Sequence, residues 1–202
     1  MAKRLRNMRV ARLGFVALLF AALLPVSGLS APTTYKVDPD HTHPMFEADH
    51  MDGLSVWRGL FAKTSGQIVF DKVAHTGIVN ISVDPASVET GMDQLNKVIS
   101  GPEFLDTANY PIVHYTGNLA GFVDGTPTRV IGSLTLHGVT RPLMLKILSF
   151  KCMPHPVFKR EVCGADALGQ FNRSDFGIDM GKQYGFRMET TLRIQVEAIA
   201  VK

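Results

Sequence analysis

The amino-acid sequence predicts an all-β fold of about eight antiparallel strands, closed into a barrel or folded into a sandwich. The clearest observation is a strict alternation from residue 186 to residue 198, where apolar or small side chains occupy every second position. A period of two predicts a long strand with one buried face and one face in water. Several rougher runs of β-branched and aromatic residues precede it, with no alternation of strands and helices. Regularly spaced runs of this kind favour an antiparallel barrel or sandwich over a parallel sheet.

Each expected strand is bounded by residues that favour turns. Asp84-Pro85, Asp124-Gly125 and His137-Gly138 separate neighbouring runs, and these residue types are common in tight turns. No internal repeat or linker interrupts the pattern, so residues 31–202 are expected to form one domain. In chain order, the expected strands cover Met45–His50, Gly66–Phe70, Gly77–Val83, Ile112–Leu119, Arg129–Leu136, Leu143–Phe150, Ala165–Phe171 and Phe186–Ala198.

One segment has the spacing of a helix. Within Thr90–Ile99, the apolar residues Met92, Leu95 and Ile99 recur at intervals of three and four, which predicts a short helix. Pro102–Tyr110 is expected to be a turn-rich loop or a further helical turn. The predicted fold therefore has one or two short helical connections.

Residues 1–30 have the composition of a secretory signal peptide. The segment carries five basic residues and no acidic one, an apolar run from Leu13 to Val26, and small residues after it. The apolar run is shorter than the roughly 20 residues that a membrane-spanning helix needs. An uncleaved membrane anchor is the alternative. We expect an exported, periplasmic protein whose mature part begins near Ala31.

The charge of the chain argues against one class of partner. The formal net charge is +3, but without residues 1–30 there are 16 basic against 18 acidic residues, a net charge of −2. The remaining Lys and Arg residues form no cluster, whereas binding to nucleic acid requires a basic surface for the phosphates. Nucleic acid is therefore excluded as an expected partner.

Cys152 and Cys163 are the only two cysteines of the sequence. In an exported chain, two cysteines are expected to form a disulfide, with two unrelated buried thiols as the alternative. The segment between them contains Pro154 and Pro156, which predicts a hairpin loop closed at its base. The ten-residue spacing is not one used by zinc sites.

No sequence motif of a known catalytic class is present, whether nucleophile elbow, zinc-protease helix, phosphate loop or dinucleotide fingerprint. His41 and His43, with His50 nearby, form the densest histidine cluster, and on a strand the first two would share a face. They are interpreted as a hydrogen-bonding pair at a barrel rim. A metal site, the alternative, would require three or four ligands. Asp175, near Arg173, is interpreted as part of a surface turn. We expect neither an enzyme nor a bound metal.

Several segments occur in an order that is typical of one family. Two of them are the most specific, Gly132–Pro142 and Asn172–Gly177. The others are Tyr35–Phe46, His50, Arg58–Phe61, Gly66–Asp71, Ser87–Gly91, Glu103–Asp106 and Tyr110-Pro111. Together they resemble the YceI-like family of polyisoprenoid- or lipid-binding proteins, over a span from about Tyr35 to Val196. The resemblance implies an extended, eight-stranded, lipocalin-like antiparallel barrel. It also implies that the lumen holds the isoprenoid chain of a quinone or a fatty amphiphile, with no further cofactor.

The expected binding residues follow from the chemistry of such a ligand. An apolar tube can hold an isoprenoid tail without catalytic groups, because each buried CH₂ contributes roughly 0.8 kcal/mol. The first group of candidates consists of apolar residues that share one face of the expected strands; Ile68, Val79 and Ile194 lie on the same face. The second group consists of polar residues at the rim of the barrel that could receive a head group. The tube candidates are Phe46, Phe70, Ile81, Val113, Tyr115, Leu134, Leu136, Leu143, Leu145, Met188 and Leu192. The rim candidates are His41 and Arg173, with Asp38 and His43 as further possibilities.

The sequence therefore favours a periplasmic protein that sequesters or carries an isoprenoid lipid or a similar amphiphile. Its expected partners are the lipid, a membrane and a quinone-using membrane protein. Two alternatives stay open. One is a metal- or histidine-dependent periplasmic enzyme, and the other is a stress-related structural barrel whose interior is filled by side chains.

Overall fold

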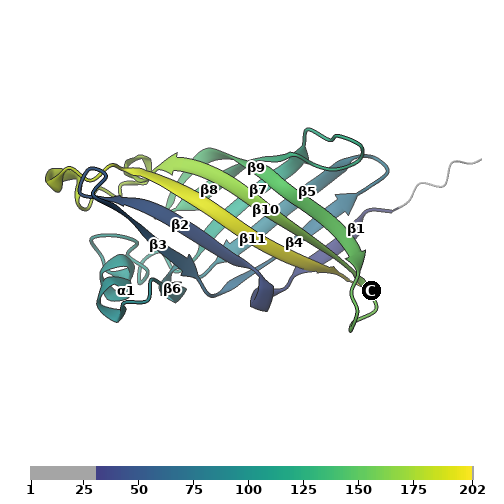
Figure 1. Cartoon of the computed structure of the whole chain (residues 1–202), viewed down its shortest axis with the longest axis horizontal. Helices are drawn as coiled ribbons and strands as arrows, with labels where there is room; N and C mark the ends of the chain where they lie inside the picture. Colours follow the sequence, from purple (N-terminus) through teal and green to yellow (C-terminus); the bar gives the residue numbers. More distant parts are fainter. Residues whose placement is uncertain (1–30, 202) are drawn as a thin grey trace, which may run out of the picture.

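Antiparallel strands form one continuous sheet that closes on itself in the computed structural model, which describes residues 31–201 (Figure 1). The strands are β1 (Thr33–Val37), β2 (His43–His50), β3 (Ser55–Phe61), β4 (Thr64–Asp71), β5 (Thr76–Val83), β6 (Val88–Glu89), β7 (Val113–Ala120), β8 (Arg129–Leu136), β9 (Val139–Pro154), β10 (Glu161–Asn172) and β11 (Glu189–Ala200). The helical elements are α1 (Asp93–Ser100) and four 3-10 turns, η1 (Pro39–His41), η2 (Pro85–Ser87), η3 (Arg173–Phe176) and η4 (Lys182–Tyr184). In this described part of the chain, no helix is both long and apolar enough to cross a membrane.

The sheet closes through β1, which pairs with strands on both of its sides. Tyr35 lies opposite Ile68 of β4 and also opposite Ala200 of β11. From β4 the ring continues through β5, β7, β8, β9 and β10 to β11, and every pairing is antiparallel. The eight-stranded barrel predicted from the sequence is confirmed.

Three neighbouring strands of the barrel are each broken into two segments, β1/β2, β3/β4 and β5/β6. The two segments of each pair occupy successive parts of one barrel strand. For example, β1 and β2 both pair with β11, one after the other along its length. Two of the breaks begin with an Asp-Pro pair, in which the aspartate side chain accepts a hydrogen bond from the amide two residues further on. Asp38 accepts from Asp40 N at 3.1 Å, and Asp84 accepts from Ala86 N at 2.9 Å. Proline has no amide hydrogen for the ladder, which explains why the ladder stops there.

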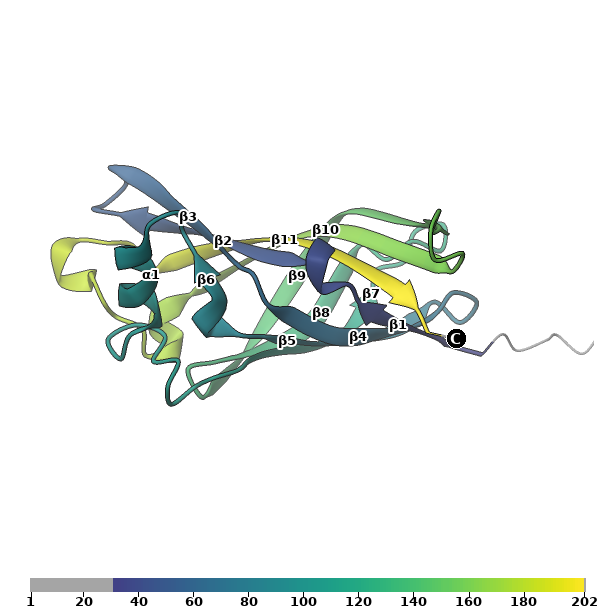
Figure 2. The same cartoon turned by 90° about the horizontal axis from the view of Figure 1, so that it is seen from below.

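The two ends of the barrel differ. The α1 end, as we name it, carries α1, the β2–β3 hairpin and the segment from Arg173 to Met188 (Figures 1 and 2). It contains deeply buried side chains from outside the strands, among them Ile99, Phe176 and Ile178. The opposite end, which we name the disulfide end, carries the β9–β10 hairpin and the last residues of β11 (Figure 1).

Strand β9 contains an irregularity that reverses which residues face the interior. Asp166 of β10 lies opposite Ser149, but the next residue, Ala167, lies opposite Ile147. Leu148 is therefore an extra residue, a β-bulge, and its side chain is exposed. On one side of the bulge odd-numbered residues face inward, and on the other side even-numbered residues such as Cys152 do so.

The elements expected from the sequence agree with the structure except that the strand segments β1, β3 and β6 were not predicted. The eight expected strands are present, and the helix expected at Thr90–Ile99 is α1, with Ile99 buried. Pro102–Tyr110 forms a series of turns, as expected. Strand β3 was not predicted, because Arg58 and Gly59 interrupt its apolar residues. The expected signal peptide, residues 1–30, lies outside the described residues.

Candidate functional site

The barrel encloses a cavity of about 220 Å³ that is lined almost throughout by apolar side chains. It extends from Tyr35 and Phe70 toward the disulfide end to Phe104 and Ile178 at the α1 end. Inward-facing residues of all eight barrel strands contribute to its wall, because alternate side chains of a closed sheet point to the interior. The interior of this barrel is therefore partly hollow.

Most of the residues that the sequence suggested for ligand binding lie on this wall. The cavity is lined by eleven of the thirteen: Phe46, Phe70, Ile81, Val113, Tyr115, Leu134, Leu136, Leu143, Leu145, Leu192 and Arg173. Leu134 and Leu136, which share parity on β8, both face the cavity. Ile68, Val79 and Ile194, of the same parity, also line it.

Two of the thirteen lie elsewhere. Met188 is buried but does not reach the cavity, because the regular alternation of β11 begins only at Glu189. Its carbonyl oxygen accepts a hydrogen bond from Arg173 N at 2.9 Å. His41 lies in the exposed turn η1 and its Nδ1 is 2.8 Å from a carboxylate oxygen of Asp38. It is therefore outside the wall.

The sequence-based selection missed aromatic and apolar residues that come from outside the predicted strands. Phe61 lies on the unpredicted strand β3, and Phe104 and Ile178 lie in connecting segments at the α1 end. No alternation marks such connecting segments, so parity could not identify them. Tyr35 could have been identified from the sequence, because the apolar Val37 follows it after the polar Lys36, as expected for a strand with one buried face.

The hydroxyl groups of three polar residues on the wall already donate hydrogen bonds within the barrel. Tyr115 donates to the carbonyl of Leu143 at 2.9 Å, and Thr42 donates to that of Glu197 at 3.1 Å. The Tyr35 hydroxyl donates to Glu161 Oε2 at 2.6 Å. Burial raises the pKa of both tyrosines well above its ordinary value. These hydroxyls are neutral and hold the wall together.

Arg173 is the charged residue of the cavity wall. It is only 5% exposed, and its guanidinium donates to the carbonyls of Ile178 at 2.9 Å and Met180 at 2.6 Å. Its Cζ lies 5.1 Å from the centre of the Phe104 ring, a cation–π contact. Burial lowers the pKa of Arg173, although an arginine side chain stays protonated in proteins. Among the described residues, Arg173 forms no salt bridge with a carboxylate.

The turn around Arg173 has the exposed face expected for Asp175 and, in addition, a buried face. Asn172 caps η3 by accepting from Ser174 N at 2.9 Å, whereas Asp175 is exposed. Arg173 and Phe176 are instead buried beneath the turn. The expectation that Asp175 lies in a surface turn is confirmed, whereas the tertiary fold buries Arg173 and Phe176 because this segment closes the α1 end of the barrel.

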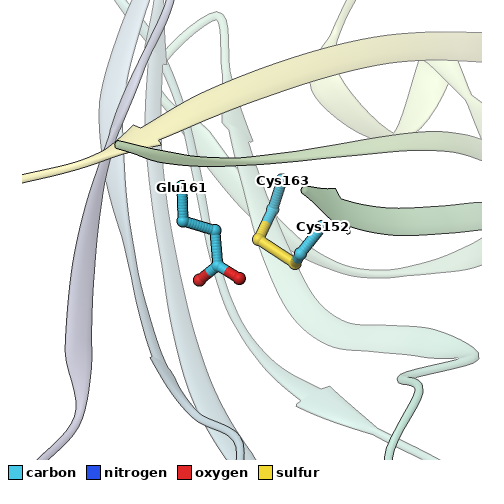
Figure 3. Close-up of side chains that lie close together, drawn as sticks. All are labelled: Cys152, Glu161 and Cys163. Carbon is cyan, nitrogen blue, oxygen red and sulfur yellow. A yellow bond between two sulfur atoms is a disulfide. The ribbon is translucent and has the colours of Figure 1, made fainter. Parts of the chain in front are cut away.

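Cys152 and Cys163 form the expected disulfide (Figure 3). They lie directly opposite each other on β9 and β10, with their Cα atoms 4.0 Å apart, at the base of the hairpin. The sulfur atoms and a carboxylate oxygen of Glu161 lie within 4.8 Å of one another. Metals are bound by thiolate sulfur, which a disulfide does not offer. Cys163 forms part of the cavity wall.

Glu161 connects the cavity wall to the outer surface at the disulfide end. Tyr35 donates to one carboxylate oxygen, and Lys72 Nζ lies 2.5 Å from the other. Burial by itself raises the pKa of Glu161, but the hydrogen bonds from Lys72 and Tyr35 outweigh it, so the pKa lies below the ordinary 4.5. The ionised carboxylate therefore stabilises the folded state above pH 4.5, and this contribution is lost as pH falls through the lower, folded-state pKa.

The substitution Glu161→Gln is accordingly expected to flatten the acid side of the stability profile. Between pH 7 and pH 3, the melting temperature of the variant should fall less than that of the wild-type protein. Thermal melting followed by circular dichroism measures the difference. The exposed Glu103→Gln is the control and should leave the wild-type profile unchanged. Parallel curves for wild type and Glu161→Gln would contradict the role assigned to Glu161.

The three histidines are not brought together. His41 pairs with Asp38, and the rings of His50 and Phe186 have centroids 5.1 Å apart at the tip of the β2–β3 hairpin. His43 begins β2, and its Nδ1 is buried without a hydrogen-bond partner. The expected hydrogen-bonding pair of His41 and His43 is therefore not formed, because His41 belongs to η1 rather than to the strand. Within residues 31–201, the only group of three potential metal ligands is Cys152, Glu161 and Cys163.

The comparisons with known proteins agree with this architecture. Over 192 residues the chain is 30% identical to protein YceI of Escherichia coli O157:H7, covering 93% of this chain and 97% of that protein. Protein YceI of Salmonella agona is 30% identical over 195 residues, with 94% and 97% covered.

Solved structures share the fold at lower sequence identity. The crystal structure of Burkholderia cenocepacia BcnA has a TM-score of 0.63 at 19% identity, covering 80% of this chain and 99% of that one. A domain of Saccharophagus degradans, described as polyisoprenoid binding, has a TM-score of 0.61 at 18% identity, with 83% and 98% covered. The YceI protein of Campylobacter jejuni has a TM-score of 0.62 at 22% identity, with 74% and 88% covered.

The closed antiparallel barrel and its apolar interior define a lipocalin-like protein. The sequence pattern of the YceI-like domain matches residues 35–200. The chain belongs to the YceI-like family.

Proposed function

We propose that this protein binds an isoprenoid lipid, of the quinone or polyprenyl type, or a similar amphiphile inside the barrel, and that it does so without catalysing a reaction. The observation that carries the proposal is the cavity, whose wall is apolar from Tyr35 and Phe70 to Phe104. A barrel of eight strands is about the smallest that can hold a single ligand in its interior. A filled structural barrel would lack such a cavity.

The energy of binding follows from the chemistry of the wall. A long hydrocarbon chain gains roughly 0.8 kcal/mol for each CH₂ group that leaves water. Three of the hydroxyl groups on the wall already donate hydrogen bonds within the barrel. A hydrocarbon chain beside them therefore leaves none of these three donors without a partner. The Saccharophagus degradans domain described as polyisoprenoid binding has the same fold, which supports the proposed class of ligand.

We place the protein in the periplasm, as the composition of residues 1–30 suggests. The Cys152–Cys163 disulfide supports this location, because disulfides persist in oxidising compartments. The physiological role is to sequester or carry the lipid near a membrane, and a quinone-using membrane protein would be the recipient if the ligand is a quinone.

The test is to purify the native protein from the periplasmic fraction and to analyse its organic extract by mass spectrometry. We expect an isoprenoid lipid or long-chain amphiphile in near-stoichiometric amount, and an intact mass that begins near Ala31. An extract without lipid, from protein that also fails to bind added long-chain quinone or fatty acid, would contradict the proposed binding. A protein that retains residues 1–28 would contradict the proposed export.

A further inference from the structure

The guanidinium of Arg173 is a buried cation with no carboxylate partner among the described residues. Arginine has five N–H donors, and the structure accounts for two of them, the bonds to Ile178 and Met180. Carbonyl groups and the Phe104 ring supply partial negative charge, but a buried ion that lacks an opposite charge is costly. The wall of the cavity is otherwise apolar or neutral at this end.

Asp179, on the far side of this loop, forms no salt bridge with Arg173 and pairs with Lys182 instead. The Asp179 carboxylate accepts a hydrogen bond from the Ser174 hydroxyl at 2.5 Å and lies 3.2 Å from Lys182 Nζ, on the outside of the turn. Its side chain is largely exposed. Electrostatic attraction to Asp179 partly offsets the lowering of the Arg173 pKa by burial, but Asp179 makes its hydrogen bond to Ser174 and its salt bridge to Lys182.

The disulfide end has the opposite character. Figure 3 shows the Glu161 carboxylate beside the disulfide, and the hydroxyl of Tyr35 already donates to that carboxylate. Lys72 approaches the same carboxylate from outside. Among the described residues, no cation lines the cavity at this end: Lys72 pairs with Glu161, and Arg160, which is not part of the cavity wall, donates to the carbonyl of Ala200.

From these two observations we propose that the ligand carries an anionic head, a carboxylate or a phosphate, which Arg173 binds at the α1 end while the hydrocarbon chain extends toward Tyr35 and Phe70. Guanidinium groups bind both anions through paired, charge-assisted hydrogen bonds. The inference rests on the proposed function, and it narrows the ligand from amphiphiles in general to acidic ones.

The first test uses the wild-type protein after removal of bound lipid. Competition binding compares oleic acid with oleyl alcohol, and geranylgeranyl phosphate with geranylgeraniol, so that each pair differs only in its head. We expect the acidic member of at least one pair to bind about 10-fold more tightly or better, the factor that one charge-assisted hydrogen bond provides. The pair with the larger ratio distinguishes a carboxylate ligand from a phosphate.

Two outcomes overturn the inference in distinguishable ways. If the alcohols bind as tightly as the acids, the anionic head is refuted while the proposed lipid binding stands. If none of the four compounds binds, the inference fails, and the proposed lipid binding fails with it when a long-chain quinone does not bind either.

The second test assigns the preference to Arg173. Arg173→Gln keeps an amide donor for the loop carbonyls but removes the charge, and it should abolish the preference for the acid while the affinity for the alcohol changes less than about 3-fold. Arg187→Gln is the matched control, because Arg187 lies at the same end, is 63% exposed and pairs with Asp52. It should retain the full preference. Should Arg173→Gln fail to fold, Arg173→Lys keeps the cation and should retain the preference. A preference that survives in folded Arg173→Gln, or is lost in folded Arg173→Lys, would refute the role of Arg173.

Discussion

Replacing Leu134 with tryptophan should abolish the binding of a long-chain amphiphile while leaving the barrel folded. Leu134 is 6% exposed and lines the cavity from β8, opposite Tyr115 of β7 and Arg141 of β9. The larger ring would occupy space that the hydrocarbon chain needs. We expect affinity for a long-chain quinone or fatty acid to fall at least about 10-fold, the equivalent of 1.4 kcal/mol. The free energy of unfolding should fall by less than the roughly 1–3 kcal/mol that overpacking of a solid core costs.

The control is Ile131→Trp on the same strand. Ile131 faces outward and is 55% exposed, so the substitution should change neither binding nor the melting temperature by much. Binding titration and thermal melting of the same samples give both quantities. A Leu134→Trp variant with unchanged lipid occupancy and a collapsed melting temperature would show that Leu134 packs in a solid core.

Removing the disulfide should lower the free energy of unfolding by roughly 2–3 kcal/mol. The bond closes a short loop, with a sequence separation of 11, and in the chain-entropy model its main effect is to restrict the unfolded chain. The double variant Cys152→Ala/Cys163→Ala removes the bond without leaving a thiol. Urea unfolding at neutral pH measures the change.

Chemical reduction supplies the matched comparison. Adding a reductant to wild-type protein should bring its unfolding midpoint close to that of the double variant, and the same reductant should not affect the variant. Equal midpoints for oxidised wild type and the variant would show that the cross-strand pairing of β9 and β10 already imposes the restriction.

The fold could be predicted largely because alternation carries structural information along each strand. In β11, the inward residues Thr190, Leu192 and Ile194 follow the period of two that the sequence displays. The same reasoning correctly placed Leu134 and Leu136 on one face. Where a strand is regular, its alternating pattern identifies the residues whose side chains face the cavity.

Other features depend on tertiary contacts, bulges or local turns that the strand period does not record. The bulge at Leu148 changes the parity of β9 in mid-strand, so counting from Leu143 alone would place Cys152 on the outer face. Arg173 is buried because a distant segment containing Phe104 packs over it. His41 does not share a strand face with His43, because Asp38 and Pro39 begin a turn there. In each case a tertiary contact or a local turn overrides the strand period.

Because three adjacent strands are broken, the resistance of the barrel to deformation is expected to differ around its circumference. Strands β9, β10 and β11 have 16, 12 and 12 residues and are joined by long ladders, whereas none of the segments β1 to β6 exceeds eight. A short ladder loses fewer hydrogen bonds when its strands separate, so deformation costs less there. We expect the long strands β9 to β11 to form the stiffer side of the barrel, and the segmented strands β1 to β6 to form the side that deforms more easily. We therefore expect an occupant of larger girth to displace the segmented strands β1 to β6 more than the long strands β9 to β11.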